Sequence, residues 1–408
     1  MMERSIRQTL AEQFSTGSAV LMTGAKRTGK TTLCRMLSEE LGIPYVTLSD
    51  IDERQSASAD PDGFIRAHGY PLIIDDVQFA PELFGTLGTI IERECRKDPE
   101  CSGLFILAGC QSHKTMEMAQ SLSEKVSYVD IPTFSISEEL GLPEKPFTIS
   151  PESSFIRCGK IPDGFDIIGK AFRGMYPEVV CDPNIDLHGF YSEYVESFID
   201  GVVPELIDMK DRPRFRSFMG IVASMTGRTL DYRLISKSTD VKQPTAEKWI
   251  DILETGGIVS ILRPYSDASV SKRAAEHPKI FMRDAGLACH LAHVSDPTVL
   301  MSSYLRDPVI GTFILNEIIK THLNGGSDAR FFHFRDSDYN RIDLVMLNGD
   351  ELSIIGCRPF MTYTVSDVKA FGKLQTSSET KGCIVCLCRK PYPITKEFYA
   401  LPAKTTGC

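Results

Sequence analysis

Glycine, lysine and threonine residues between Gly24 and Thr32 are spaced so that they can hold a chain of phosphates. The segment has a glycine, four further residues, Gly-Lys and a threonine, and it lies between a predicted strand and a predicted helix. Gly24 and Gly29 allow backbone N–H groups to face an anion at the N-terminus of that helix, whose dipole favours negative charge. We expect Lys30 to reach the β and γ phosphates of a nucleotide and the Thr31 hydroxyl to coordinate Mg²⁺. The expected nucleotide contacts are Gly24, Ala25, Lys26, Arg27, Thr28, Gly29, Lys30, Thr31 and Thr32.

Two adjacent carboxylates supply the acids that such a loop requires. The apolar run that begins at Leu72 ends in Asp75-Asp76, as expected for a buried strand that delivers its last residues to the edge of a sheet. We interpret Asp75 as the acid that holds the metal through water, and Asp76 as the residue that polarises the attacking water. For Asp76 an alternative stays open, because an Asp after a strand often serves only as a helix N-cap or lies in a solvated turn. The candidate catalytic residues are thus Lys30 and Asp76, the metal ligands Thr31 and Asp75, and the cofactors ATP and Mg²⁺.

The surrounding sequence predicts the elements that must position these residues. Between Ser18 and Ile131, short apolar runs alternate with helix-like stretches, a pattern typical of a parallel sheet covered by helices. The runs are Ala19–Met22, Tyr45–Leu48, Leu72–Ile74, Leu104–Leu107 and Val126–Ile131. We therefore predict that residues 1–142 form an α/β domain with the parallel sheet of a P-loop NTPase.

Three changes in the texture of the sequence predict the rest of the organisation. Residues 143–189 are rich in Pro and Gly and show no sustained period, which indicates a linker or lid. Residues 190–300 are mainly helical, and within them three short helical patterns precede two strand-like runs, the order of a winged helix. Residues 301–408 begin with a helix and continue with strand-like runs, which predicts a compact α/β unit.

The composition limits the classes of function. The chain has 408 residues, of which 42% are hydrophobic and 24% charged, as in ordinary globular proteins with about two to four domains of this total length. Its 45 Lys and Arg against 54 Asp and Glu give a net charge of −9, which argues against coating nucleic acid through bulk charge. The apolar runs are too short to cross a membrane and no apolar leader opens the chain, so we expect a cytoplasmic protein.

Twelve cysteines are scattered through apolar segments, where a reduced thiol behaves as a small hydrophobic group. Cys383, Cys386 and Cys388 form the one cluster, in a β-rich run without a second Cys pair or a nearby His. We predict that this run is a buried strand and not a zinc site.

An ordered set of short motifs accompanies the phosphate loop. They are Asp52-Glu-Arg54, Asp60–Phe64, Ile73–Gln78 with Pro81, Phe105–Gly109, Ser121-Leu122, Arg173–Glu178 and Pro278–Leu287. Together with the loop they resemble the predicted AAA-type ATPases of bacteria and archaea that join an ATPase domain to a C-terminal DUF4143 region. The resemblance implies an AAA-like domain that uses ATP, and a homo-oligomer in which an arginine of a neighbouring subunit completes the site. Arg173 and Arg228 are candidates for that arginine.

Several positions depart from the family pattern where nucleotide is sensed or hydrolysed. Asp76 stands in place of a usual Glu, and Ala108-Gly109-Cys110 replaces a Thr-Gly-Ser sensor, unless Gln111 or Ser112 substitutes for the lost hydroxyl. Glu124-Lys125 replaces Gly-Arg, and Asp200-Gly201 replaces Arg-Asp. We therefore expect ATP to bind, with slow hydrolysis or none.

The C-terminal region resembles the family's restriction-endonuclease-like domain in a degenerate form. That domain implies a helix Glu, a strand Asp and a Glu-x-Lys that together hold a divalent metal. Glu317 and Asp343 match the first two elements, whereas Gly356 and Arg358 replace the Glu and the Lys. Because a carboxylate is lost and guanidinium does not bind metal, we predict a structural or docking module without nuclease activity, in which Arg358 pairs with Glu317 or Asp343.

Two classes of function are compatible with the sequence. The first is a nucleotide-dependent switch, and the second is a non-catalytic protein- or DNA-binding module whose P-loop domain uses nucleotide only structurally. The predicted recognition helix, Thr245–Thr255, carries three acidic residues against Lys248, which opposes contact with DNA. A small basic wing at Lys272-Arg273 keeps DNA contact open, beside an unidentified protein partner.

Overall fold

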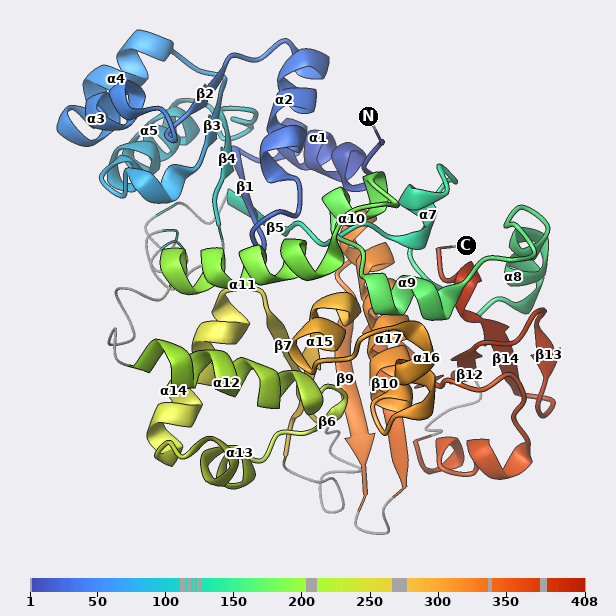
Figure 1. Cartoon of the computed structure of the whole chain (residues 1–408). Helices are drawn as coiled ribbons and strands as arrows, with labels where there is room; N and C mark the ends of the chain where they lie inside the picture. The colour runs from blue at the N-terminus through green and yellow to red at the C-terminus, as the bar shows by residue number, and fades with distance from the viewer. Residues whose placement is uncertain are drawn as a thin grey trace. The chain divides into compact units, whose positions relative to one another are not determined.

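The chain folds into two compact units, whose elements are labelled in Figure 1. The structure, a computed structural model, describes residues 2–110, 115, 119, 122, 126–202, 211–265, 277–336, 340–374 and 380–407. The first of the two units, which we call the N-terminal unit, comprises Glu3–Thr133 with Thr255–Gly257. The other, the C-terminal unit, comprises Met1–Met2, Phe134–Glu254 and Ile258–Cys408.

The N-terminal unit contains a five-stranded parallel sheet with the strand order β2-β3-β4-β1-β5. Its strands are β1 (Ala19–Thr23), β2 (Tyr45–Thr47), β3 (Leu72–Asp75), β4 (Phe105–Ala108) and β5 (Val126–Asp130). Because all five run in one direction, their C-terminal ends share an edge, and the candidate loop and Asp75 both lie there. The parallel sheet predicted from the alternating pattern is confirmed.

Helices cover the sheet of the N-terminal unit. They include α1 (Ile6–Thr16), α2 (Lys30–Leu41), α3 (Ile51–Ala59), α4 (Pro61–His68) and α5 (Leu83–Lys97). Alternate residues of β1 enter two different cores: Ala19 and Leu21 pack in one, whereas Val20 and Met22 pack in the other. Burial on both faces explains why this strand is a continuous apolar run rather than an alternating one.

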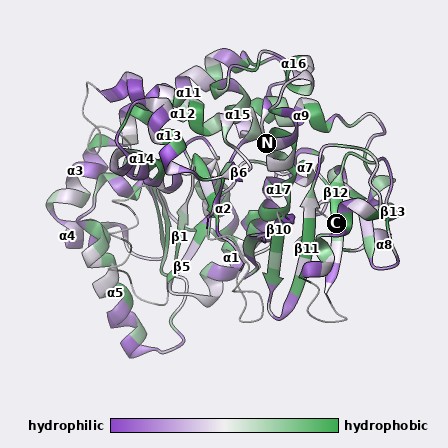
Figure 2. Ribbon diagram, turned by 90° about the horizontal axis from the view of Figure 1, so that it is seen from below, coloured by the Kyte–Doolittle hydropathy of each residue, from purple (hydrophilic) through white to green (hydrophobic). Residues whose placement is uncertain are grey.

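The C-terminal unit contains a six-stranded mixed sheet with the order β13-β14-β12-β11-β10-β9. Its strands are β9 (Arg330–Arg335), β10 (Arg341–Asn348), β11 (Glu351–Cys357), β12 (Lys381–Cys386), β13 (Tyr392–Pro393) and β14 (Phe398–Pro402). The long helix α17 (Arg306–Asn324) packs against β11. Figure 2 shows hydrophobic colours along much of β10, in agreement with the burial of its central residues. Cys383 and Cys386 lie buried on β12, as the sequence predicted for this run.

A helical layer and a small sheet precede this larger sheet in the chain. The elements are α11 (Leu187–Val202), α12 (Arg212–Ser224), α13 (Tyr232–Thr239), α14 (Gln243–Thr255), β6 (Arg228–Thr229), β7 (Val259–Leu262) and β8 (Lys279–Met282). The three strands are antiparallel in the order β6-β8-β7, and β7 and β8 follow the three helices in the predicted order. The winged helix itself stays a prediction. Trp249 packs edge-on against Phe215 and Phe218 in the core of this layer.

The region 143–189, predicted from its composition to be a linker or lid, contains regular helices, and its role as a linker or lid stays a prediction. It forms three short helices, α8 (Pro151–Cys158), α9 (Ile167–Arg173) and α10 (Pro177–Cys181), and they follow α7 (Ile136–Glu139). Ser150 and Asp166 cap α8 and α9 with their side chains, and Pro151 and Pro177 occupy first-turn positions where a missing N–H costs nothing. Helices of 5 to 8 residues are too short to show a clear period, so the sequence pattern does not reveal them.

Two of the family motifs meet at the carboxylate of Asp284, which caps α15 (Ala285–Leu291). Its Oδ2 accepts the N–H of Met175 at 2.9 Å, and its Oδ1 accepts the Tyr191 hydroxyl at 3.0 Å and the N–H of Leu287 at 2.9 Å. Gly174, at φ 82°, has no room for a side chain, because a Cβ there would strike Tyr191 and Asp284. The motifs therefore form one buried junction of the C-terminal unit.

We predict that Asp284→Ala lowers the stability of the C-terminal unit by about 2–4 kcal/mol, because the buried N–H groups of Met175 and Leu287 would lose their acceptor. The Tyr191 hydroxyl would keep the Arg173 carbonyl as its acceptor. Urea unfolding followed by the fluorescence of Trp249, the single tryptophan, measures this loss in the adjoining core. Asp296→Ala is the matched control: Asp296 caps α16 (Pro297–Ser302) at the surface, so its removal should cost far less. Equal effects of the two substitutions would show that the junction has no special role.

Candidate nucleotide-binding site

The candidate loop follows the central strand β1 and ends where α2 begins at Lys30. Gly29 occupies the N-cap position with φ 91° and ψ 21°, a left-handed conformation that favours glycine. A Cβ on Gly24 would lie 2.7 Å from the carbonyl oxygen of Ile131, so this position also excludes a side chain. Both glycines are thus required by the backbone path that turns the loop toward the helix N-terminus.

The ammonium group of Lys30 lies inside the loop. Its Nζ donates hydrogen bonds to the carbonyl oxygens of Gly24 at 3.0 Å and Ala25 at 2.7 Å, and the residue is only 8% exposed. The Thr28 hydroxyl donates to the same Ala25 carbonyl at 3.1 Å. Phosphate oxygens are stronger hydrogen-bond acceptors for a cation than neutral carbonyls. A phosphate that enters the loop can therefore replace the two carbonyls as the partner of the ammonium group.

Arg4 supports the loop from the N-terminal segment, and no sequence motif points to it. Its guanidinium donates to the carbonyl oxygens of Thr28 at 2.7 Å and Pro132 at 2.8 Å, and the residue is buried. An arginine before the first helix has no spacing relation to the loop, so only the folded structure reveals the contact.

The structure brings together the two residues predicted to hold the metal. Asp75 ends β3 and is buried, and its carboxylate accepts hydrogen bonds from the Tyr45 hydroxyl at 3.1 Å and from the N–H of Asp76 at 2.9 Å. Burial raises the pKa of Asp75, and a hydrogen bond with the Thr31 side chain opposes that rise. The Thr31 side chain and the carboxylate therefore form a pair at the sheet edge, and their predicted metal role stays a prediction.

Asp76 is held by two side chains that sequence reasoning missed. Its Oδ2 accepts from the Ser49 hydroxyl and its Oδ1 accepts from the Gln78 amide at 3.0 Å. Asp76 precedes the short 3-10 helix Val77–Phe79 with φ 57°, but its side chain makes no capping hydrogen bond. The N-cap alternative is therefore wrong for the side chain, which is engaged by Ser49 and Gln78 instead.

Gln78 also reaches the strand end where the family places its sensor. Its Oε1 accepts the backbone N–H of Cys110 at 3.2 Å, so one amide links Asp76 to the segment after β4. Gln111 and Ser112, the expected substitutes for the sensor hydroxyl, lie outside the described residues, as do Glu124 and Lys125.

The motif residue Arg54 orders the segment that carries Ser49. Its Nε donates to the carbonyl oxygen of Leu48 at 2.9 Å and its Nη2 to that of Ser49 at 3.2 Å. The guanidinium carbon also lies 4.5 Å from the centroid of the Phe79 ring, a cation–π distance. Through these contacts the motif around Arg54 positions a hydroxyl on Asp76.

The two acids that the resemblance placed in one nuclease centre have different partners in the C-terminal unit. Glu317 is buried on α17, where it accepts from the N–H of Ile136 at 2.8 Å and from Lys320 Nζ at 2.8 Å. Burial raises the pKa of Glu317, while Lys320 opposes the rise. Asp343 pairs instead with Arg358, with 2.8 Å between Oδ2 and Nε. The prediction that Arg358 pairs with one of these acids is confirmed for Asp343.

Position 356 leaves little space for the missing carboxylate. A Cβ on Gly356 would approach Ile384 and Phe371, each at 3.3 Å, so a glutamate would enter an apolar and closely packed surrounding. Within the described residues, no group of three or more His, Cys, Asp and Glu side chains could hold a metal ion. The basic wing at Lys272-Arg273 lies outside the described residues.

The two candidate arginine donors differ in their surroundings. Arg173 donates to the carbonyl oxygens of Val179 and Asp182 in its own unit, at 3.4 and 3.2 Å. Arg228 is exposed, and its guanidinium carbon lies 5.5 Å from the centroid of the Tyr304 ring. An exposed guanidinium stacked on a ring is easier to redirect than one that donates to backbone carbonyls. Arg228 is therefore the better candidate, and the role itself stays a prediction.

Comparison with protein families matches three successive parts of the chain. The AAA domain model covers residues 16–140, and the DUF4143 model, a domain of unknown function, covers residues 308–406. A further domain of unknown function, DUF8612, covers residues 166–298. The AAA match contains the candidate loop and Asp75-Asp76.

The individual relatives do not indicate a function for this chain. The uncharacterized proteins Rv2008c of Mycobacterium tuberculosis and Mb2031c of Mycobacterium bovis are each 25% identical over 306 residues, 73% of this chain but only 62% of the relative. The Walker-type ATPase PABY2304 of Pyrococcus abyssi is 14% identical, with 71% of this chain and 96% of that protein covered at a TM-score of 0.39, too low to carry an argument. In the described part of the chain no helix is long and apolar enough to cross a membrane.

We predict that Lys30→Ala abolishes ATP binding, because it removes the buried cation that the loop holds ready for the phosphates. Titration with a fluorescent ATP analogue measures the affinity, and Lys97→Ala, an exposed lysine on α5, is the control that should leave it unchanged. Unaltered affinity in a folded Lys30→Ala protein would overturn the assignment of the loop.

We also predict that the chain does not cleave single- or double-stranded DNA with Mg²⁺ or Mn²⁺, because Asp343 is neutralised by Arg358 and Glu317 by Lys320. Incubation of supercoiled plasmid followed by gel electrophoresis tests this. Nicking that disappears in Asp343→Ala but persists in Lys30→Ala would show a working nuclease.

Proposed function

This chain joins an AAA domain to a C-terminal DUF4143 domain, and from that architecture we propose a cytoplasmic Mg-ATP-dependent switch that hydrolyses ATP slowly or not at all. The observation that carries the proposal is the buried ammonium of Lys30, held by two loop carbonyls at the N-terminus of α2. A lysine in that place has few uses other than to meet an anion.

ATP binding would change the partners of Lys30. The ammonium would leave the carbonyls of Gly24 and Ala25 for phosphate oxygens, and those carbonyls would turn toward other donors. Thr31 and Asp75 would hold Mg²⁺, which supplies charge neutralisation on the phosphates when bound. Arg4, which is bonded to the Thr28 carbonyl, would experience any shift of the loop directly. The nucleotide state is thereby linked to backbone contacts outside the loop.

Slow hydrolysis is proposed because of the way in which Asp76 is held. Both of its carboxylate oxygens accept hydrogen bonds, from Ser49 and Gln78, which hold the side chain and reduce its reach toward a water molecule. The side chain is also one methylene shorter than the Glu of the family pattern. A carboxylate in this position is better suited to detecting the nucleotide than to rapid turnover.

A second candidate is a non-catalytic binding protein whose nucleotide only stabilises the N-terminal unit. The engagement of both Asp76 oxygens favours it as well, because the same contacts serve a purely structural role. Phosphate release separates the two candidates when the switch hydrolyses ATP slowly, because that release depends on Lys30, whereas the binding protein releases none.

The proposal includes a homo-oligomer, with an exposed arginine such as Arg228 completing the site of a neighbouring subunit, and an unidentified protein partner. It does not include DNA contact through α14. Glu247, Asp251 and Glu254 give that helix an acidic character that would repel phosphates.

We predict that substitutions of Asp75 and of Asp76 have different effects on ATP binding and on phosphate release. Asp75→Asn should weaken ATP affinity only when Mg²⁺ is present, since Asp75 lies beside Thr31 on the metal side. Asp76→Asn should leave affinity unchanged and lower phosphate release, whereas Asp76→Glu should raise it because the longer side chain reaches farther. If both Asn variants bind and turn over like the parent chain, the pair is structural.

The proposed function is tested by measuring phosphate release from ATP with Mg²⁺ for the parent chain and for Lys30→Ala. We expect release well below about 1 per second, the low end for enzymes, and none in the variant. ATP binding without any Lys30-dependent release over hours would favour the second candidate.

A further inference from the structure

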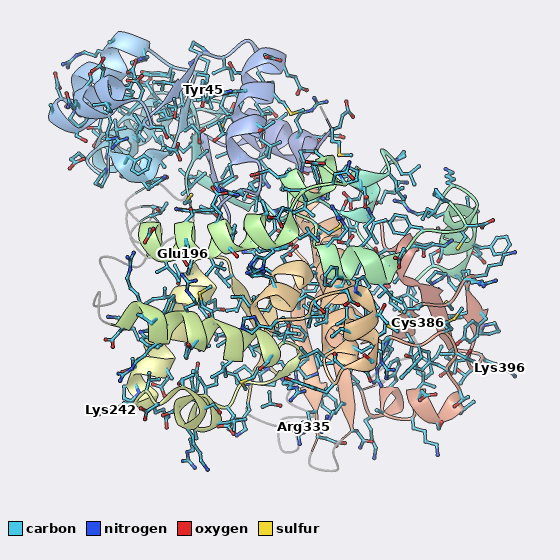
Figure 3. All side chains as sticks on the ribbon, in the orientation of Figure 1. Tyr45, Glu196, Lys242, Arg335, Cys386 and Lys396 are labelled. Carbon is cyan, nitrogen blue, oxygen red and sulfur yellow. The ribbon has the colours of Figure 1, made fainter. Side chains whose placement is uncertain are left out.

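Side chains from three strands, and one that directly follows a fourth strand, meet around the carboxylate of Asp343 in the C-terminal unit. Lys279 comes from β8, His333 from β9, Asp343 from β10, and Arg358 directly follows β11; we call these four residues the Lys279 cluster. Asp343 Oδ1 lies 3.7 Å from Lys279 Nζ, and Oδ2 accepts from Arg358 Nε at 2.8 Å and from the N–H of Cys357 at 3.1 Å. Arg335, at the end of β9, is labelled in Figure 3 and guides the eye to this region.

The cluster leaves polar groups without the partners that buried groups normally have. Lys279 is 7% exposed, and among the described residues its ammonium has no acceptor within hydrogen-bond distance, only the carboxylate at 3.7 Å. His333 is also buried: its Nε2 meets the His277 carbonyl at 3.1 Å, whereas its Nδ1 has no hydrogen-bond partner among those residues. Within the described part of the chain, Arg358 donates a hydrogen bond to Asp343 through Nε alone, which leaves its terminal N–H groups for another acceptor.

The charges of the region do not balance either. Among the described residues, the carboxylate of Asp343 lies against two cations, Lys279 and Arg358, and Arg341 is a third cation near Lys279. Burial lowers the pKa of His333 to about 4, so this residue is neutral near pH 7. Burial, together with Arg341 and Arg358, also lowers the pKa of Lys279, while Asp343 opposes the change. An anion at this place would relieve both the repulsion and the lack of acceptors.

The exposure of the cluster indicates from which side an anion would enter. The side chain of Asp343 is 24% exposed and that of Arg358 is 31% exposed, whereas that of Lys279 is 8% exposed. Solvent thus reaches the Asp343 and Arg358 side, and Lys279 forms the floor. A ligand must carry several charged oxygens on a group narrow enough to approach a buried ammonium.

We propose that the Lys279 cluster binds a phosphate monoester, with Lys279 and Arg358 donating hydrogen bonds to its oxygens. A monoester has one substituent and three free oxygens, so its phosphate can enter end-on, whereas a diester carries a substituent on both sides. Guanidinium offers two parallel donors to such a group, and an ammonium adds a point charge. The monoester can be a free phosphorylated small molecule or the phosphorylated end of a nucleic-acid strand.

The test uses the full chain with Lys30→Ala as the background, so that phosphate bound by the P-loop does not contribute and the outcome is independent of the proposed function. Inorganic phosphate is titrated by calorimetry into this protein and into versions that also carry Lys279→Met or Lys381→Met. Lys381 is exposed on β12 and pairs with Glu351, so it is the control for loss of a surface charge. We expect Lys279→Met to weaken phosphate binding at least about tenfold and Lys381→Met to leave it unchanged.

A second variant protects the test against misfolding. Lys279→Met should remain folded, because it removes a poorly partnered buried charge, and Trp249 fluorescence and circular dichroism check this. If it does not fold, Arg358→Gln replaces it, and the same tenfold loss is expected. Absence of phosphate binding to the Lys30→Ala background would overturn the proposal. Phosphate binding by folded Lys279→Met or Arg358→Gln variants as tight as in that background would overturn it too.

The two sources of the monoester are separated with short single-stranded DNA. A strand with a 5′-phosphate that binds more tightly than the same strand with a 5′-hydroxyl, with the preference lost in Lys279→Met, supports a strand end. Equal binding of both strands alongside Lys279-dependent binding of phosphate supports a free small molecule.

Discussion

A buried ammonium group held by the carbonyls of its own loop is the interaction on which the N-terminal unit depends. Lys30 can occupy that place only because Gly24 and Gly29 allow the backbone to close around it, and because β1 ends at the shared edge of a parallel sheet. Arg4 fixes the loop from outside through the Thr28 and Pro132 carbonyls. An ammonium group bonded to neutral carbonyl oxygens can exchange them for phosphate oxygens, which are stronger acceptors.

The parts of the site that depend on local spacing could be predicted from the sequence. Gly24 to Thr32 and Asp75-Asp76 follow from short-range patterns at strand ends, and the structure places them at one sheet edge. The contacts of Arg4 and Ser49, and the link from Gln78 to Cys110, could not be found in this way, because they join segments that have no fixed separation along the chain. The helices of region 143–189 could not be predicted either, because each is too short to show a helical period.

In the C-terminal unit, each of the two acids that the resemblance assigns to a metal site is paired with a cation. With Gly at position 356, Asp343 is paired with Arg358, and Glu317 is buried against Lys320. The sequence predicted the first pairing only as one of two alternatives, because it cannot place a helix residue relative to a sheet. Lys279 lies on β8, which precedes the sheet that carries Asp343. The nuclease motif does not include this strand and therefore does not point to Lys279. Each unit thus holds a buried lysine, Lys30 or Lys279, whose ammonium group makes no hydrogen bond to a charged acceptor among the described residues.

Competition among ATP, ADP and AMP for the parent chain tests the central claim most directly. If Lys30 and the loop hold the β and γ phosphates, ATP and ADP should displace a fluorescent ATP analogue, and AMP should not at concentrations about a hundredfold higher. AMP that competes as well as ATP, or an analogue that does not bind at all, would contradict the assignment of Lys30 to the β and γ phosphates.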